Sequence, residues 1–219
     1  MLQNPRCSHS LKSQLYRNFG KLYASQGKVK EALEHLANDI YFSSLEVGPE
    51  HVDTAGGYFH CGLLFHESNR LESALAMFDK TADIWYKFLS RKPDADGAEG
   101  EKEDGEKEDG DEGEAAQGKN PADDLNLVEL DEMSGVEATE MLQRIISIRE
   151  QHLGVTHTAT GEAHFILGLI FKNLGRTEKA LERIQKALSV YEDTLGVDHH
   201  ITSSVKEELD RLEAAYFAV

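Results

Sequence analysis

Apolar residues along much of the chain recur at spacings of three and four, which is typical of amphipathic helices. The pattern over 8–26 and 28–46 predicts a first pair of helices. It returns over 52–89 and again over 158–195, and a last amphipathic helix is predicted at 201–217. The chain is therefore expected to be all-α.

A short string of residues recurs inside three of these helical stretches. A glycine is followed three residues later by an aromatic residue, seven later by Gly or Asn, and twelve later by Ala. The glycine and alanine positions are Gly20, Ala32, Gly62, Ala74, Gly168 and Ala180. Glycine inside a helix costs about 1 kcal/mol relative to alanine, so these positions predict a close helix contact in which Gly meets Ala. The intervening residue predicts a left-handed end of the first helix, at Gly27, Asn69 and Gly175.

The spacing of the glycines predicts how many helical pairs the chain contains. Gly20 and Gly62 are 42 residues apart, whereas Gly62 and Gly168 are 106 apart, which is two periods and 22 extra residues. A third pair is therefore expected at 121–133 and 137–152, with its turn at Gly135.

The composition changes abruptly between Asp94 and Gly118, where twelve Asp or Glu occur with two Lys and no aromatic or β-branched residue. Such a segment cannot bury enough apolar surface to offset its ordering entropy. We expect 93–120 to be an acidic disordered insertion. It would separate repeats 1 and 2 (8–92) from repeats 3 and 4 and a capping helix (121–219).

The repeated string is similar to that of the tetratricopeptide repeat, a helix-turn-helix unit that stacks into a solenoid. This resemblance implies a right-handed α-solenoid of about four hairpins with a C-terminal capping helix. The period of 42 exceeds the usual length of about 34. It resembles the longer repeat of kinesin light chains, whose linkers also read Leu-Gly-x-x-His, as at 153–157 and 195–199 here.

Candidate chemistry is sparse. His51, His157 and His199 occupy the same linker position of three repeats, which indicates a structural role rather than metal binding. No His-Glu-x-x-His, Cys-x-x-Cys, phosphate-binding Gly-rich loop or Gly-x-Ser-x-Gly motif occurs. We expect no enzyme activity, cofactor or metal. A formal net charge of −17 argues against nucleic acid or an anionic membrane as the main partner.

In tetratricopeptide proteins the first helix of each repeat lines a concave groove. The resemblance therefore implies partner-binding positions on these helices. They are Arg17, Lys21, Phe59, Leu63, His66, Phe165, Leu169 and Lys172. Exposed aromatic and leucine side chains would suit an apolar or helical segment of a partner. The alternative, that these apolar residues pack against the next repeat, remains open from the sequence.

Three strings resemble a narrower family. They are His-Leu-Ala-Asn-Asp-Ile-Tyr-Phe at 35–42, Gly-Gly-Tyr-Phe-His at 56–60 and Asp-Ile-Trp-Tyr at 83–86. They are similar to the repeat half of axonemal MYND zinc-finger proteins, although the zinc finger itself is not in this sequence. Either the chain is part of a longer or alternatively shortened protein, or it is a relative without the finger.

This narrower resemblance implies a subunit associated with an inner dynein arm of cilia or flagella. Its partners would be another tetratricopeptide protein and inner-arm dynein components, in the cytoplasm, the cytoskeleton and the axoneme. One alternative is a cytosolic cargo or chaperone adaptor of the kinesin-light-chain type. The other is a chaperone of basic proteins that uses the acidic run at 94–118.

Overall fold

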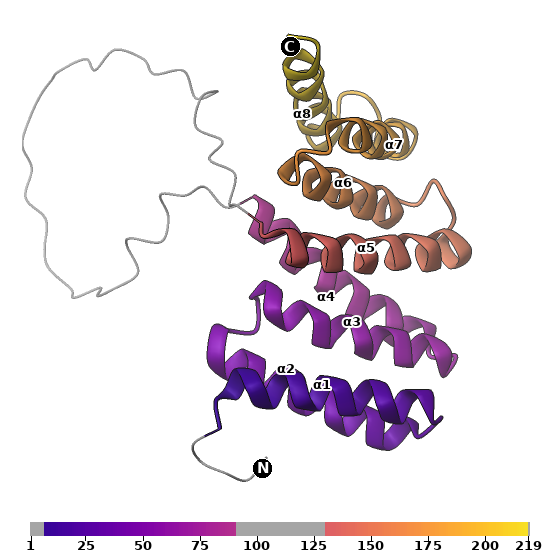
Figure 1. The fold of residues 1–219 in the computed structure, drawn as a ribbon. Coiled ribbons are helices and arrows are strands. Elements are labelled where there is room, and N and C mark those ends of the chain that lie inside the picture. The colour runs from indigo at the N-terminus through magenta and orange to yellow at the C-terminus, as the bar shows by residue number, and fades with distance from the viewer. Residues whose placement is uncertain (1–6, 91–129, 219) are drawn as a thin grey trace, which may run out of the picture.

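The computed structural model describes residues 7–90 and 130–218, and all regular structure within these ranges is α-helical (Figure 1). The eight helices of the described residues are α1 (His9–Ser25), α2 (Val29–Val47), α3 (Val52–Glu67), α4 (Leu71–Leu89), α5 (Glu132–Leu153), α6 (Thr158–Asn173), α7 (Thr177–Leu195) and α8 (His200–Phe217). Each helix packs mainly on its neighbours in the sequence, which stacks them into a solenoid. The predicted all-α solenoid is confirmed.

Three helical hairpins form the regular part of the stack: α1 with α2, α3 with α4, and α6 with α7. The turn inside each hairpin contains one residue in the left-handed region. These residues are Gly27 (φ 71°), Asn69 (φ 56°) and Gly175 (φ 68°). The repeated Gly or Asn therefore ends the first helix of each hairpin as the sequence predicts, because these residues adopt a positive φ at little cost.

The linkers that precede α3, α6 and α8 share one arrangement of hydrogen bonds. A glycine with φ between 91° and 98° ends the preceding helix. Three residues later a histidine caps the next helix, since its Nδ1 accepts a hydrogen bond of 3.2 Å from the backbone N–H two residues further on. The capping residues are His51, His157 and His199. The structural role predicted for these histidines is confirmed, and it is helix capping.

Each repeated glycine lies where the two helices of its hairpin cross. A Cβ atom added to Gly20, Gly62 or Gly168 would lie 2.5–2.6 Å from a large side chain of the second helix. Those side chains are Leu36, Phe78 and Ile184. The predicted partners Ala32, Ala74 and Ala180 are fully buried, but each lies one turn earlier. The predicted contact of glycine with alanine is confirmed at Gly168, where the added Cβ atom would also lie 3.3 Å from the backbone oxygen of Ala180. In all three hairpins the nearest atoms belong to the side chain one turn later, because helical side chains lean back towards the N-terminus and cover the turn before them.

The third repeat differs most from its prediction. The insertion at 93–120 and most of the helix predicted at 121–133 lie outside the described residues. Glu132 and Met133 belong to α5, which starts here because Asp131 Oδ1 accepts a hydrogen bond of 2.9 Å from the Ser134 N–H. Gly135 is therefore inside a helix and not at a turn.

Gly135 serves packing instead. A Cβ atom there would lie 2.6 Å from Leu174 Cδ2, so the missing side chain lets the end of α6 approach α5. Arg149 of α5 links helices on either side of residues 91–129, and its side chain is fully buried. It donates to the Asp79 carboxylate on α4 and to the Ala159 carbonyl oxygen on α6.

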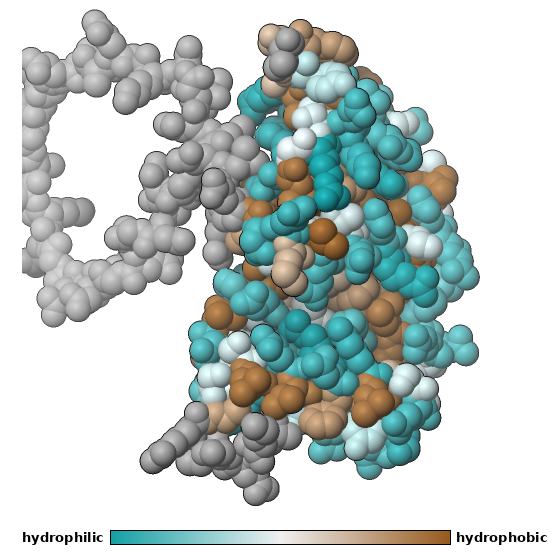
Figure 2. Space-filling view, viewed as in Figure 1, coloured by the Kyte–Doolittle hydropathy of each residue, from teal (hydrophilic) through white to brown (hydrophobic). Residues whose placement is uncertain are grey.

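The N-terminal end of the stack leaves apolar side chains uncovered along α1. Leu11, Phe19 and Leu22 are 38–50% exposed, although the sequence places them on the apolar face of their helix. Figure 2 shows hydrophobic residues gathered in a row at this end of the molecule. Among the described residues, no further helix covers the face of α1 that carries Leu11, Phe19 and Leu22.

Candidate protein-binding surface

The first helices of the hairpins, α1, α3 and α6, carry the predicted partner-binding positions. Between α1 and α3 lies a cavity of about 240 Å³. Lys21 and Ala24 of α1 line one side, and His60, Leu63 and Glu67 of α3 line the other. Lys21 is exposed and Leu63 is half-buried, so both present atoms to this cavity.

Arg17 is anchored rather than free. Its Nε lies 2.8 Å from Asp39 Oδ2, and its Nη2 donates a hydrogen bond of 2.7 Å to the Asp53 carbonyl oxygen. Asp39 is fully buried and also accepts from the Ser13 hydroxyl. Arg17 therefore joins α1, α2 and the start of α3, and this role is structural whatever else the residue contacts.

The two predicted groove phenylalanines differ in exposure. Phe59 is only 7% exposed, and its ring centroid lies 6.2 Å from that of Phe78 in the core. Phe59 is therefore buried in the core and not open in a groove, and this contact is with α4 of its own hairpin rather than with the next repeat. Phe165 is half-buried, with its ring 6.5 Å from that of Tyr86 on α4.

The remaining predicted positions have partners within the chain or lie partly open. His66 Nε2 is 3.1 Å from His152 Nε2 on α5. Lys172 forms an ion pair with Glu208 on α8. Leu169 is half-buried and follows Gly168 as Lys21 follows Gly20. Lys21, Leu63 and Leu169 thus occupy the same place in their three hairpins and stay predicted partner contacts.

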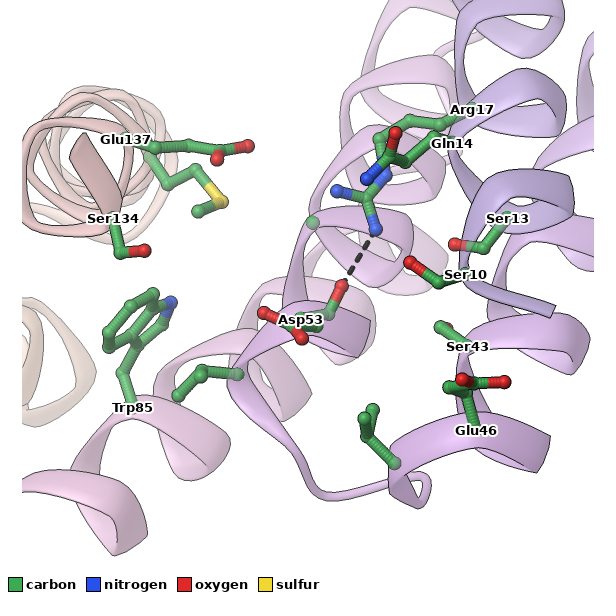
Figure 3. A pocket seen from close by; sticks show the side chains of 14 residues that line it. Ser10, Ser13, Gln14, Arg17, Ser43, Glu46, Asp53, Trp85, Ser134 and Glu137 are labelled. Carbon is green, nitrogen blue, oxygen red and sulfur yellow. Dashed lines mark hydrogen bonds between the residues drawn. The ribbon is translucent and has the colours of Figure 1, made fainter. Parts of the chain in front are cut away.

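A second cavity, of about 230 Å³, was not foreseen from the sequence (Figure 3). It lies between α1 on one side and α5 on the other, with the start of α3 between them. Its walls are mostly polar and come from five helices. Because residues of α1 and α5 are more than a hundred positions apart in the sequence, no local pattern brings them together.

Burial is the largest cause of the shifted pKa values of His60, which lines the first cavity, and of the adjacent Cys61. Desolvation, followed by the charges of Lys21 and Arg17, lowers the pKa of His60 to about 3. Desolvation, followed by the charge of Asp39, raises the pKa of the Cys61 thiol to about 12. His60 is therefore neutral at neutral pH, and Cys61 remains a protonated thiol that is a poor nucleophile.

The lowered pKa of His60 predicts a loss of stability in acid. Below its ordinary pKa of 6.5 the unfolded chain binds a proton at His60, whereas the folded chain does not until about pH 3. The free energy of unfolding should therefore fall as pH drops through this window. Urea denaturation at neutral and mildly acidic pH should show a smaller loss for His60→Gln than for wild type. The control His200→Gln, at an exposed position, should lose as much as wild type; equal losses in all three chains would contradict the assignment.

The described ranges contain no group of three or more His, Cys, Asp or Glu residues that could hold a metal ion. Among their helices, none is long and apolar enough to cross a membrane.

A family model of the tetratricopeptide repeat matches residues 167–201, which include α7. Among solved structures, the chain is similar to nearly identical TPR-like repeats of a Podosopora anserina protein assigned as a kinesin light chain. The identity is 14% and the TM-score is 0.34, and the match covers 94% of this chain and 89% of that chain. The chain is also similar to MamA, from residue 41 to its end, of Desulfovibrio magneticus RS-1, at 14% identity, with 93% and 96% covered and a TM-score of 0.30. The family match shows that the chain contains a tetratricopeptide repeat, a unit that presents extended surfaces for binding proteins when it is stacked.

Proposed function

We propose that this chain is a non-catalytic scaffold that binds protein partners along the first helices of its hairpins. The observation that carries the proposal is the repeated placement of Lys21, Leu63 and Leu169, which leaves side-chain atoms accessible at equivalent positions of α1, α3 and α6. Lys21 and Leu63 also line the cavity between α1 and α3. A solenoid offers such repeated positions as one extended surface.

The proposed setting is an inner dynein arm of cilia or flagella, with another tetratricopeptide protein and dynein components as partners. Its support is the resemblance of the strings at 35–42, 56–60 and 83–86 to axonemal MYND proteins. The second candidate is a cytosolic cargo or chaperone adaptor. Its support is the Leu-Gly-x-x-His linker and the period of 42.

Affinity capture from extract of ciliated cells tests both settings. We expect wild-type chain to recover inner-arm dynein components with a second repeat protein. The double variant Lys21→Glu, Leu169→Lys should recover much less of them, because it reverses one charge and places another on the proposed surface. Its helical circular dichroism should match that of wild type, since neither side chain belongs to the buried core.

A matched control makes the same chemical changes on a second helix. Lys30→Glu with Leu45→Lys alters two exposed positions of α2 and should leave capture unchanged. Equal recovery with both double variants would contradict the proposed surface. Recovery of kinesin or chaperone components in place of dynein would favour the adaptor.

A further inference from the structure

The cavity between α1 and α5 contains a polar group that the fold leaves unsatisfied. Trp85 is only 2% exposed, and its indole Nε1–H has no hydrogen-bond partner among the described residues. Figure 3 shows the nitrogen on the side of the ring that faces the cavity. Buried donors in folded proteins are almost always paired, so this one marks a wall to which an acceptor could be added.

The charges around the cavity favour a cation. Its one basic lining side chain, Arg17, is neutralised by the buried carboxylate of Asp39. Three lining carboxylates remain, from Glu46, Asp53 and Glu137. Glu46 and Asp53 each have a histidine nitrogen 3.5 Å away, on His9 and His51 respectively.

Glu137 differs from the other two acidic residues because the described residues offer it no ion pair. It is exposed on α5 and projects towards the open space opposite Arg17 and Gln14 (Figure 3). A carboxylate without an ion-pair partner gains most from a positively charged ligand. Glu137 is therefore the side chain whose charge a ligand would neutralise most directly.

The size of the cavity limits what can enter. Its volume of about 230 Å³ lies below the range of roughly 300–1,000 Å³ typical of pockets for drug-sized ligands. A helix cannot fit between α1 and α5 here. One long side chain and the peptide group next to it can fit there. The serine residues Ser10, Ser13, Ser43 and Ser134 line the cavity that this side chain would enter.

We propose that this cavity receives a Lys or Arg side chain from an extended segment of a protein partner. The cationic group lies beside the Glu137 carboxylate, in a cavity that Asp53 and Glu46 also line, and a main-chain carbonyl of the segment accepts from Trp85 Nε1–H. This inference rests on the proposed scaffold function and adds the chemistry of one contact. The acidic run at 94–118 of this chain has the wrong sign for the same place.

Selection from a display library of random twelve-residue peptides tests this inference with the full chain. We expect the retained peptides to be enriched in Lys or Arg. Because Trp85 is the only tryptophan, these peptides should also change the intrinsic fluorescence of the chain. Glu137→Lys should weaken the selected peptides about tenfold or more, since it places like charges together. Glu140→Lys, one turn along α5 and outside this cavity, is the matched control and should weaken them far less.

Three outcomes would overturn the inference: no retained peptides, retained peptides without an excess of basic residues, or equal weakening by both lysine variants. None of these outcomes contradicts the scaffold proposal, which is tested by affinity capture with the Lys21 and Leu169 variants. If the chain captures its partners from extract but retains no basic peptides, the scaffold proposal stands and the proposed contact in this cavity is wrong.

Discussion

Arg17→Ala is expected to lower the free energy of unfolding by about 3–5 kcal/mol, the cost of leaving a buried charge without its partner. Asp39 is fully buried, and Arg17, 17% exposed, is the cation that pairs with it. The substitution also removes the donor to the Asp53 carbonyl oxygen, which ties α1 to the start of α3. Only the Ser13 hydroxyl would remain bonded to the Asp39 carboxylate.

Urea denaturation followed by Trp85 fluorescence measures this loss. Lys21→Ala, one turn later on α1 and exposed, should change stability by no more than about 0.5 kcal/mol. Adding Asp39→Asn to Arg17→Ala should recover part of the loss, because the orphaned charge is then absent. If Arg17→Ala were as stable as Lys21→Ala, the ion pair would not be holding these helices together.

This prediction also affects how binding experiments are interpreted. Arg17 is one of the positions that the family resemblance implies for partner contact. A loss of binding in an Arg17 variant would follow from local unfolding alone, so it could not identify a contact. Lys21 and Leu169 are better probes because their side chains are accessible and lie outside the buried core.

The solenoid was predictable because its signals are local and repeated. Gly20, Gly62 and Gly168 mark the helix crossings, and Gly27 and Gly175 end the first helices at positive φ. Each signal lies within one hairpin of about forty residues, and repetition at a fixed period separates it from chance. The side chains that fill each crossing, Leu36, Phe78 and Ile184, were not predicted because sequence spacing does not show which way a side chain leans.

The start of α5 and the second cavity were not predictable for related reasons. Gly135 resembles a turn residue, and only the approach of Leu174, 39 positions later, shows that it is a packing position. The exposure of Phe59 depends on where Phe78 lies in three dimensions. The cavity beside Trp85 combines residues of five helices. A single sequence contains no record of such pairings between distant positions.

Gly168→Leu is expected to destabilise the last hairpin by about 1–3 kcal/mol through overpacking. Even a Cβ atom at this position would lie 2.5 Å from Ile184 Cγ1 and 3.3 Å from the backbone oxygen of Ala180. Ile184 and Ala180 are both fully buried, so neither can move into solvent. At roughly 2–4 °C per kcal/mol for a chain of this size, the thermal midpoint should fall measurably.

The contact between Gly168 and Ile184 can also be tested by making the side chain at position 184 smaller. Gly168→Ala and Ile184→Ala should each destabilise the chain, the first by crowding and the second by leaving a cavity of the kind that costs about 2–5 kcal/mol. Combined, they should cost less than the sum of the two, because the smaller side chain at 184 makes room for the new methyl group. Ser203→Leu, at an exposed position of α8, controls for the added apolar surface. Strict additivity, or a Gly168→Leu midpoint equal to that of Ser203→Leu, would show that α6 and α7 do not meet at Gly168.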